Sequence, residues 1–280
     1  NDFEIMVRTG GSPEATLIGI NEASTFNGFC ARHDRETFRP LEAAPFNGSR
    51  EQCFLLLYRA WARETYTKQA AVSSIEIYRE ADKGRAVSDQ HAIQSFVSAF
   101  AAGLEEGLTD VLYYKAILDR ALIDRAYETV RSLIFWFDSP PDILFSGATY
   151  PYSDFGGTQV QFAGPDPRPA PLAASLLTLP SGSAAVFSWL RDSADAPSRF
   201  LASLRAQDRL GDAIVRFAFS AFENVFARPS WWEALPEADR QNLIELLVGY
   251  MNPVTETRAD HLADDGRRLT TWSLARITEV

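Results

Sequence analysis

Two side chains that bind metals well lie three residues apart near the start of the chain. Cys30 and His33 form a Cys-x-x-His pair, and Asp34 follows directly. Thiolate and imidazole are good zinc ligands, and such a pair at the junction of a loop and a helix supplies two of the four positions of a tetrahedral site. Cys53, the other cysteine, lies on the apolar side of a predicted helix, and the other two histidines are far away in sequence. Cys30 and His33 are therefore candidate zinc ligands of a site whose remaining ligands the sequence does not identify.

Two other interpretations of this pair are open. In the first, Cys30 is a small buried hydrophobic residue and His33 makes only a local hydrogen bond. In the second, the pair is catalytic, with His33 and Asp34 as the candidate catalytic residues. A catalytic pair needs a base within hydrogen-bond reach and a third group that orients it, and spacing alone does not establish either.

The order of elements before His33 is that of a ββα-metal nuclease finger. Phe3 to Ile20 is predicted to form a β-hairpin, because two apolar runs flank the turn sequence Gly-Gly-Ser-Pro. A loop follows, and then a short helix that carries His33. A finger of this kind also needs a general-base histidine on or near the hairpin. The predicted hairpin contains no histidine, so a nuclease site built on it is incomplete.

Residues 29–68 resemble a group of uncharacterised bacterial proteins that carry an FCxxHD motif. The resemblance is carried by FCARHD at 29–34 with Phe38 and Glu42, by YRA at 58–60, and by RExYxK at 63–68. Members often have a zinc-finger-like or HNH-like segment upstream. The resemblance implies that Cys30 and His33 complete a finger begun earlier in the chain. This chain departs from that pattern because it has no Cys-x-x-Cys pair, and the resemblance brings no known activity.

Three cations on the helix after the motif form a candidate anion-binding group. Arg59 and Arg63 are four residues apart, as are Glu64 and Lys68, so each pair lies on neighbouring turns. Arg59, Arg63 and Lys68 are predicted to hold an anion or a nucleic-acid phosphate. The alternative is an exposed face with one weak ion pair, worth about 0.3–0.5 kcal/mol.

Two further groups have a functional and a structural interpretation. The acidic segment 260–265, with Asp260, His261, Asp264 and Asp265, is either a cation site or a solvated loop, and the loop is expected. Trp231-Trp232 either stacks on a ligand or anchors a helix to the core, and the second is expected. His91, near the start of a long helix, is expected to be an ordinary surface or capping residue.

Composition limits the class of protein. The chain has 280 residues, 46% of them hydrophobic, and a formal net charge of -10. That charge argues against coating nucleic acid through a general basic surface, although a local patch remains open. Two cysteines in a chain of this length do not make a disulfide framework and favour a reducing, cytoplasmic location. No apolar run reaches the roughly 18 residues of a membrane span, so no membrane association is expected.

The elements that position these residues predict an α+β fold. A long helical hairpin fills the N-terminal half, with one helix of about 30 residues from a Ser49 N-cap and a second from Ser88. An antiparallel sheet is predicted in the middle, between about residues 133 and 192, and helices follow in the C-terminal part. The division expected is 1–48 for the hairpin and FCxxHD loop, and 49–280 for the helical and sheet body, in one continuous unit.

The middle and the end of the chain carry the more local predictions. Apolar runs and turn signals predict strands near residues 133–137, 143–145, 157–162, 174–179 and 184–190, and a terminal strand within 269–280. Helices are predicted over residues 200–205, 210–226 and 237–250, with a further turn of helix capped by Ser230.

The leading hypothesis for function is a bacterial protein that acts by binding, for example as a subunit of a stress or defence complex, with a protein partner or a homo-oligomer. The alternative is a metal-dependent HNH-like nuclease that uses the Cys30/His33 loop. The common phosphate-loop, dinucleotide, zinc-protease and esterase motifs are absent. An enzyme with a dispersed acidic site is neither supported nor excluded, so the choice between binding protein and enzyme is open.

Overall fold

A six-stranded antiparallel sheet is the centre of the fold in the computed structural model, which describes residues 14–19, 23, 26, 28–193, 195–251 and 258–280. The sheet order is β5-β2-β3-β4-β1-β6. The strands are β1 (Val130–Phe137), β2 (Ile143–Thr149), β3 (Leu172–Leu179), β4 (Gly182–Leu190), β5 (Val225–Ala227) and β6 (Leu274–Glu279). The described helices are α2 (Ala31–Glu42), α3 (Arg50–Ser73), α4 (Ile75–Arg79), α5 (Val87–Asp124), α6 (Asp195–Arg205), α7 (Leu210–Ala221), α8 (Pro229–Ala234) and α9 (Glu237–Met251).

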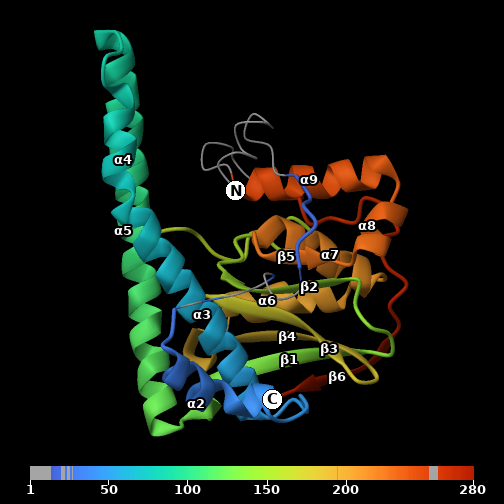
Figure 1. The fold of residues 1–280 in the computed structure, drawn as a ribbon. Helices are drawn as coiled ribbons and strands as arrows, with labels where there is room; N and C mark the ends of the chain where they lie inside the picture. The colour runs from blue at the N-terminus through green and yellow to red at the C-terminus, as the bar shows by residue number, and fades with distance from the viewer. Residues whose placement is uncertain (1–13, 20–22, 24–25, 27, 194, 252–257) are drawn as a thin grey trace.

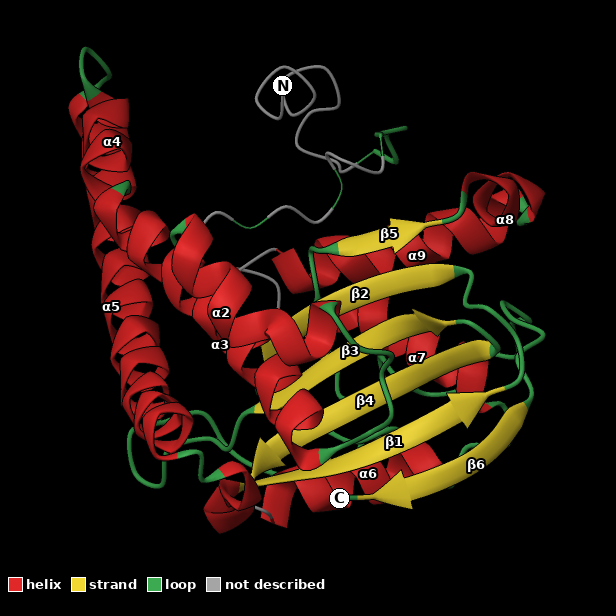
Figure 2. Cartoon of the chain, turned by 60° about the horizontal axis from the view of Figure 1, so that its bottom comes forward, coloured by secondary structure: helices red, strands yellow, loops and turns green. Residues whose placement is uncertain are grey.

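Helices cover both faces of the sheet, so the fold is α+β as the sequence predicts. Helix α3 crosses one face, and α6 and α7 lie on the other (Figure 2). The continuous apolar run of β1 matches this arrangement. Successive side chains of a strand point to opposite faces of the sheet, so both sets must be apolar where helices cover both faces. Phe135 packs in the cluster shared with α6 and α7, whereas Ile134 packs with Cys53 of α3 on the opposite face. The strand predicted near residues 133–137 is therefore confirmed, and it is buried on both faces.

The strands predicted near residues 174–179 and 184–190 are confirmed as β3 and β4, which form a hairpin, and a glycine fixes its tight turn. Gly182 has a φ of 135°, and a Cβ on it would lie 2.1 Å from the carbonyl oxygen of Phe137 on β1. No other residue fits there without moving the neighbouring strand. All nine residues of β4 are buried, so this strand forms the middle of the core.

The long helical hairpin of the N-terminal half is formed by α3 and α5. Ser49 caps α3 by accepting a hydrogen bond from the backbone N–H of Gln52 at 3.3 Å. The Gln52 side chain does not return the bond to Ser49 but accepts from the backbone N–H of Asn47. Only Ser74 separates α3 from α4, so the helical path is nearly continuous, and α5 runs back beside it for 38 residues. The outer part of this hairpin projects beyond the rest of the molecule (Figure 1).

Two segments of the sheet region differ from the prediction. Residues 157–162 form no strand, because the Asp154 carboxylate accepts hydrogen bonds from the backbone N–H groups of Gly156 and Thr158 and folds the chain into a turn. Strand β5 was predicted as the end of a helix. Helix α7 instead stops at Ala221, and Phe222 turns back in an extended conformation to stack on Phe145 at 5.4 Å.

Three smaller predictions concern the ends of the chain and α8. Much of the predicted hairpin at 3–20 lies outside the described residues, and the described residues 14–19 are in no strand. Helix α8 begins after Arg228 rather than after Ser230, since Pro229 occupies its first turn. The terminal strand is confirmed as β6, which pairs with β1. In the part of the chain that the structure describes, no helix has the length and apolar character needed to cross a membrane.

Candidate functional site

The Cys30–His33 pair lies at the first turn of α2, as the sequence predicts. Cys30 is the N-cap residue of α2 and makes no side-chain cap. Its Sγ lies 3.4 Å from His33 Nδ1, and both side chains are on the surface. Because Cys30 is exposed, the interpretation of this residue as a buried small hydrophobic side chain is wrong. The interpretation of His33 as a local hydrogen-bonding residue agrees with its contact to Cys30.

Within the described part of the chain, the other ligands that a zinc site needs are not assembled around this pair. Cys53 is fully buried on α3. Burial raises the pKa of its thiol to about 11, although the hydrogen bond with Ser132 acts in the opposite direction. It therefore stays a neutral thiol near pH 7 and faces the sheet. No group of three or more His, Cys, Asp or Glu side chains suited to a metal ion occurs among the described residues.

Much of the FCxxHD segment holds α2 against α3. Phe29 contacts Phe38 edge to face, with ring centroids 5.2 Å apart, and Phe38 is fully buried beside Tyr58. The guanidinium of Arg59 lies 4.1 Å from the centroid of the Phe38 ring and pairs with Glu42 at 2.5 Å. Since these positions also carry the resemblance, packing explains a large part of the motif without any ligand.

The three predicted anion-binding cations do not converge. Arg59 faces α2, where it lies 3.9 Å from Asp34 in addition to its pair with Glu42. Lys68 lies beside Gly107 of α5 and 3.9 Å from Glu64. Burial raises the pKa of the Glu64 carboxyl above its usual value, and the charge of Lys68 offsets part of this rise. Arg63 has no ion pair with another described residue. Arg59 and Lys68 are thus ion-paired with different neighbours, and the three cations do not form one binding group.

The tail segment also uses its charges internally. Asp260 pairs with Arg258 at 2.8 Å, and His261 Nδ1 contacts the Arg258 carbonyl oxygen at 2.7 Å. Asp264 and Asp265 lie 3.6 and 3.9 Å from the guanidinium of Arg216, which is only 2% exposed. These aspartates balance the charge of a buried arginine, so the expectation of an ordinary solvated loop was incomplete.

The two tryptophans at the start of α8 anchor it, as expected. Trp231 donates through Nε1 to the Leu269 carbonyl oxygen at 2.8 Å, and Trp232 stacks on Phe219 of α7. His91 is an exposed residue of α5.

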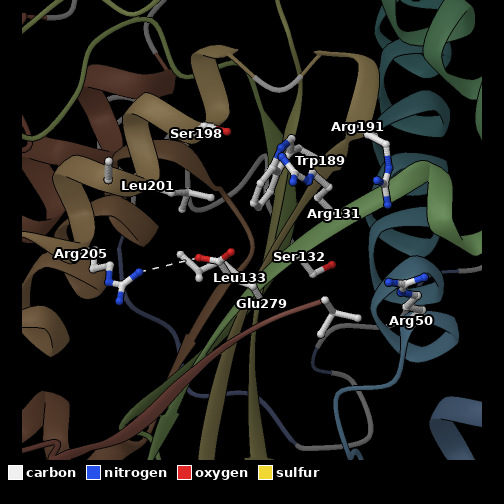
Figure 3. A pocket seen from close by; sticks show the side chains of 12 residues that line it. Arg50, Arg131, Ser132, Leu133, Trp189, Arg191, Ser198, Leu201, Arg205 and Glu279 are labelled. Carbon is white, nitrogen blue, oxygen red and sulfur yellow. Dashed lines mark ion pairs between the residues drawn. The ribbon is translucent and has the colours of Figure 1, made fainter.

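Two features that could serve a function were not identified from the sequence. The first is an apolar surface on the projecting helices, where Phe96 and Phe100 of α5 stack with centroids 5.9 Å apart and Tyr78 of α4 meets Phe100 edge to face. The second is a pocket at one end of the sheet, lined by four arginines from different elements (Figure 3). Periodicity could have indicated the first, since Phe96 and Phe100 are four apart. No local pattern indicates the second, because its arginines are scattered over more than half of the chain.

Comparison with protein-family models, with curated proteins and with solved structures found no match to this chain. The resemblance to proteins with an FCxxHD motif therefore stays a prediction. Function has to be argued from the geometry described above.

Proposed function

We propose that this protein acts by binding, and that the outer part of its helical hairpin, residues 72–104 (the arm), associates with the same arm of a second copy. The carrying observation is the exposed aromatic cluster Tyr78, Phe96 and Phe100. Phe96 is 52% exposed and Tyr78 is 50% exposed, on an element that projects from the body (Figure 1). Aromatic side chains gathered on a projecting surface are typical of interfaces.

The core of the arm is too small to account for its apolar residues. Only Ile75, Val97 and Ala101 are buried within it, with Val72, Ile93 and Leu104 packed around them. Ile77 and Val87 are 72% and 82% exposed. Most helical stability in proteins comes from packing of an apolar face, and two helices alone cover little of each other. A second hairpin would complete a four-helix arrangement of the kind that buries such faces.

Charge favours a second copy as the occupant. The arm contributes only -1 to the chain's net charge of -10, so two arms meet with little repulsion. Its charged residues are Glu76, Glu80, Asp82 and Asp89 against Arg79, Lys83 and Arg85. Four of these seven charged residues already pair along the helix surface, as Arg79–Glu76 and Lys83–Glu80. A twofold contact brings the same cluster from each copy together, which is the commonest symmetry of homo-oligomers.

Sedimentation equilibrium tests this proposal. The natural protein is expected to be a dimer. Phe96→Glu is expected to weaken it by about 1,000-fold, because a buried aromatic anchor contributes about 2 kcal/mol and is present twice. Ile123→Glu is the matched control, since Ile123 is a 75% exposed apolar residue of the same helix outside the arm. Circular dichroism checks that both variants stay helical.

A natural protein that is monomeric at about 100 μM, well above the micromolar range of ordinary association, would overturn self-association. A dimer that Phe96→Glu leaves intact would place the interface elsewhere. Monomeric protein that captures a different chain through the arm, lost in Phe96→Glu, would keep the binding role and replace its partner. A place in a bacterial stress or defence complex and a cytoplasmic location remain predictions.

The metal-dependent nuclease is the second candidate, favoured by the 3.4 Å contact of Cys30 Sγ with His33 Nδ1. It predicts about one zinc per chain, since a structural site takes four ligands around one ion. Elemental analysis of protein without a histidine tag is expected to show the metal lost in Cys30→Ser and in His33→Ala, with cleavage of DNA or RNA lost in His33→Ala. His91→Ala, on the exposed face of α5, is the control. Metal-free natural protein would remove this candidate.

A further inference from the structure

A pocket of about 390 Å³ opens at one end of the sheet, between α6 and the start of α3. Five helices and strands contribute to its lining: Arg50 of α3, Arg131 at the start of β1, Trp189 near the end of β4, Arg205 of α6 and Glu279 of β6. Arg191, directly after β4, also lines it. Figure 3 shows Arg205 on one side of the pocket, Arg50 and Arg191 on the other, and Arg131 with Trp189 between them. The volume falls within the range of about 300–1,000 Å³ that is usual for small-molecule sites.

The pocket is cationic in a chain that is acidic overall. Arg50, Arg131, Arg191 and Arg205 face a single carboxylate side chain in the lining, that of Glu279, which lies 3.8 Å from Arg205. Arg191 donates through Nε to the Glu128 carbonyl oxygen at 2.9 Å, which leaves its terminal amino groups for another acceptor. Neither Arg50 nor Arg131 forms an ion pair or hydrogen bond with a side chain in the described ranges. Four guanidinium groups with one acidic side chain among them suit an anionic ligand.

A buried donor inside the same lining lacks a partner. Trp189 is 7% exposed, and its Nε1–H has no hydrogen-bond partner among the described residues. Trp189 lies directly across from Arg131 in the β1–β4 register, so the indole and the guanidinium are neighbours on one face of the sheet. Buried donors in proteins are nearly always satisfied, and one left unpaired costs stability. This unpaired donor belongs to a side chain that lines the pocket.

We propose that this pocket binds a small ligand that carries phosphate. A guanidinium presents a planar fork of donors that matches phosphate oxygens, and several forks around one cavity suit a group with more than one charged oxygen. The half-enclosed shape and the contribution of five elements favour a compact phosphorylated molecule over an extended strand, which requires a groove that follows its backbone. This proposal is independent of the arm, because Arg50 of the pocket is the first residue of α3, whereas the arm begins at the other end of that helix.

Isothermal titration with pyrophosphate and with a nucleoside triphosphate tests the proposal. Both probes are expected to bind with 1:1 stoichiometry, more weakly as salt rises. Arg131→Gln and Arg50→Gln are each expected to weaken binding by tenfold or more. Arg35→Gln is the matched control, because Arg35 is an exposed arginine of α2 outside the pocket. Trp189→Phe keeps the aromatic packing and removes the Nε1 donor, and is expected to weaken binding several-fold.

Three results would overturn the proposal. One is the absence of binding for both probes at millimolar concentration. Another is an equal loss of affinity in Arg35→Gln and Arg131→Gln, which would indicate attraction to the general surface. The last is tight binding of a single-stranded 20-mer that pyrophosphate does not displace, which would assign the pocket to nucleic acid. Since Arg50 and Arg131 are exposed, their substitution is not expected to disturb folding, and thermal unfolding of each variant checks this.

Discussion

Replacing Asp212 by alanine is expected to lower the free energy of unfolding by about 3–5 kcal/mol, the cost of breaking a buried, hydrogen-bonded charge network. The Asp212 side chain is 1% exposed. Its Oδ1 accepts from the backbone N–H of Leu269 at 3.0 Å, and from the backbone N–H and the hydroxyl of Thr270 at 2.7 and 2.9 Å. Its Oδ2 accepts from Arg209. Alanine leaves all four donors without this acceptor, and urea unfolding followed by fluorescence measures the loss.

The expected effect has a structural consequence that a control can separate. Asp212 on α7 fixes the segment that leads into β6, so its loss is expected to free that edge of the sheet as well as to lower stability. Asp208→Ala is the control, because Asp208 is an exposed acid four residues earlier and should change stability by less than about 0.5 kcal/mol. Asp212→Asn keeps an acceptor for the Thr270 donors and loses the charge facing Arg209, so an intermediate loss is expected. Equal stability of Asp212→Ala and Asp208→Ala would contradict this account.

The sequence predicted the elements whose pattern is local and strong. Three of these elements are present in the structure: the apolar strand β1, the β3–β4 hairpin and the helix capped by Ser49. Each is marked in the sequence by an apolar pattern or a turn signal. Strand β5 was missed because it has only three residues. It follows the point where α7 ends and Phe222 stacks on Phe145, which is a contact between distant parts of the chain. A pattern of residues adjacent in the sequence does not indicate such a long-range contact.

The same difference explains the candidate sites. Cys30 and His33 are close in sequence, and their contact was predictable from their spacing on a helix turn. Arg59 and Lys68 have suitable types on one helix, but α2 and α5 flank that helix and draw these cations in different directions. The arginine-lined pocket could not be predicted, since it exists only where the sheet brings Arg131 beside Trp189 and α6 adds Arg205. Sequence spacing thus located pairs within one element and missed groups assembled by the sheet.

Trp61→Ala is expected to lower the free energy of unfolding by about 3–5 kcal/mol, as is usual when a large buried aromatic side chain is deleted. Trp61 of α3 is 1% exposed, and its Nε1 donates to the Val111 carbonyl oxygen of α5 at 3.0 Å. Its ring meets Tyr114 of α5 and Tyr150 edge to face, with centroids 5.8 and 5.9 Å away. Trp61 therefore joins the two long helices to the loop that follows β2, and alanine leaves a cavity between all three. Urea unfolding followed by circular dichroism measures the effect.

Two matched variants distinguish loss of packing from loss of the hydrogen bond. Trp61→Phe retains part of the aromatic surface and removes the Nε1–H donor, so its expected cost is smaller, about 1–3 kcal/mol. Gln69→Ala, at an exposed position two turns further along α3, is expected to change stability by less than about 0.5 kcal/mol. If Trp61→Ala cost no more than Gln69→Ala, the base of the arm would not be held by this contact. Trp61→Phe weakens the contact at the base of the arm and leaves Phe96 unchanged. Its dimer affinity therefore shows whether the arm needs a rigid base to associate.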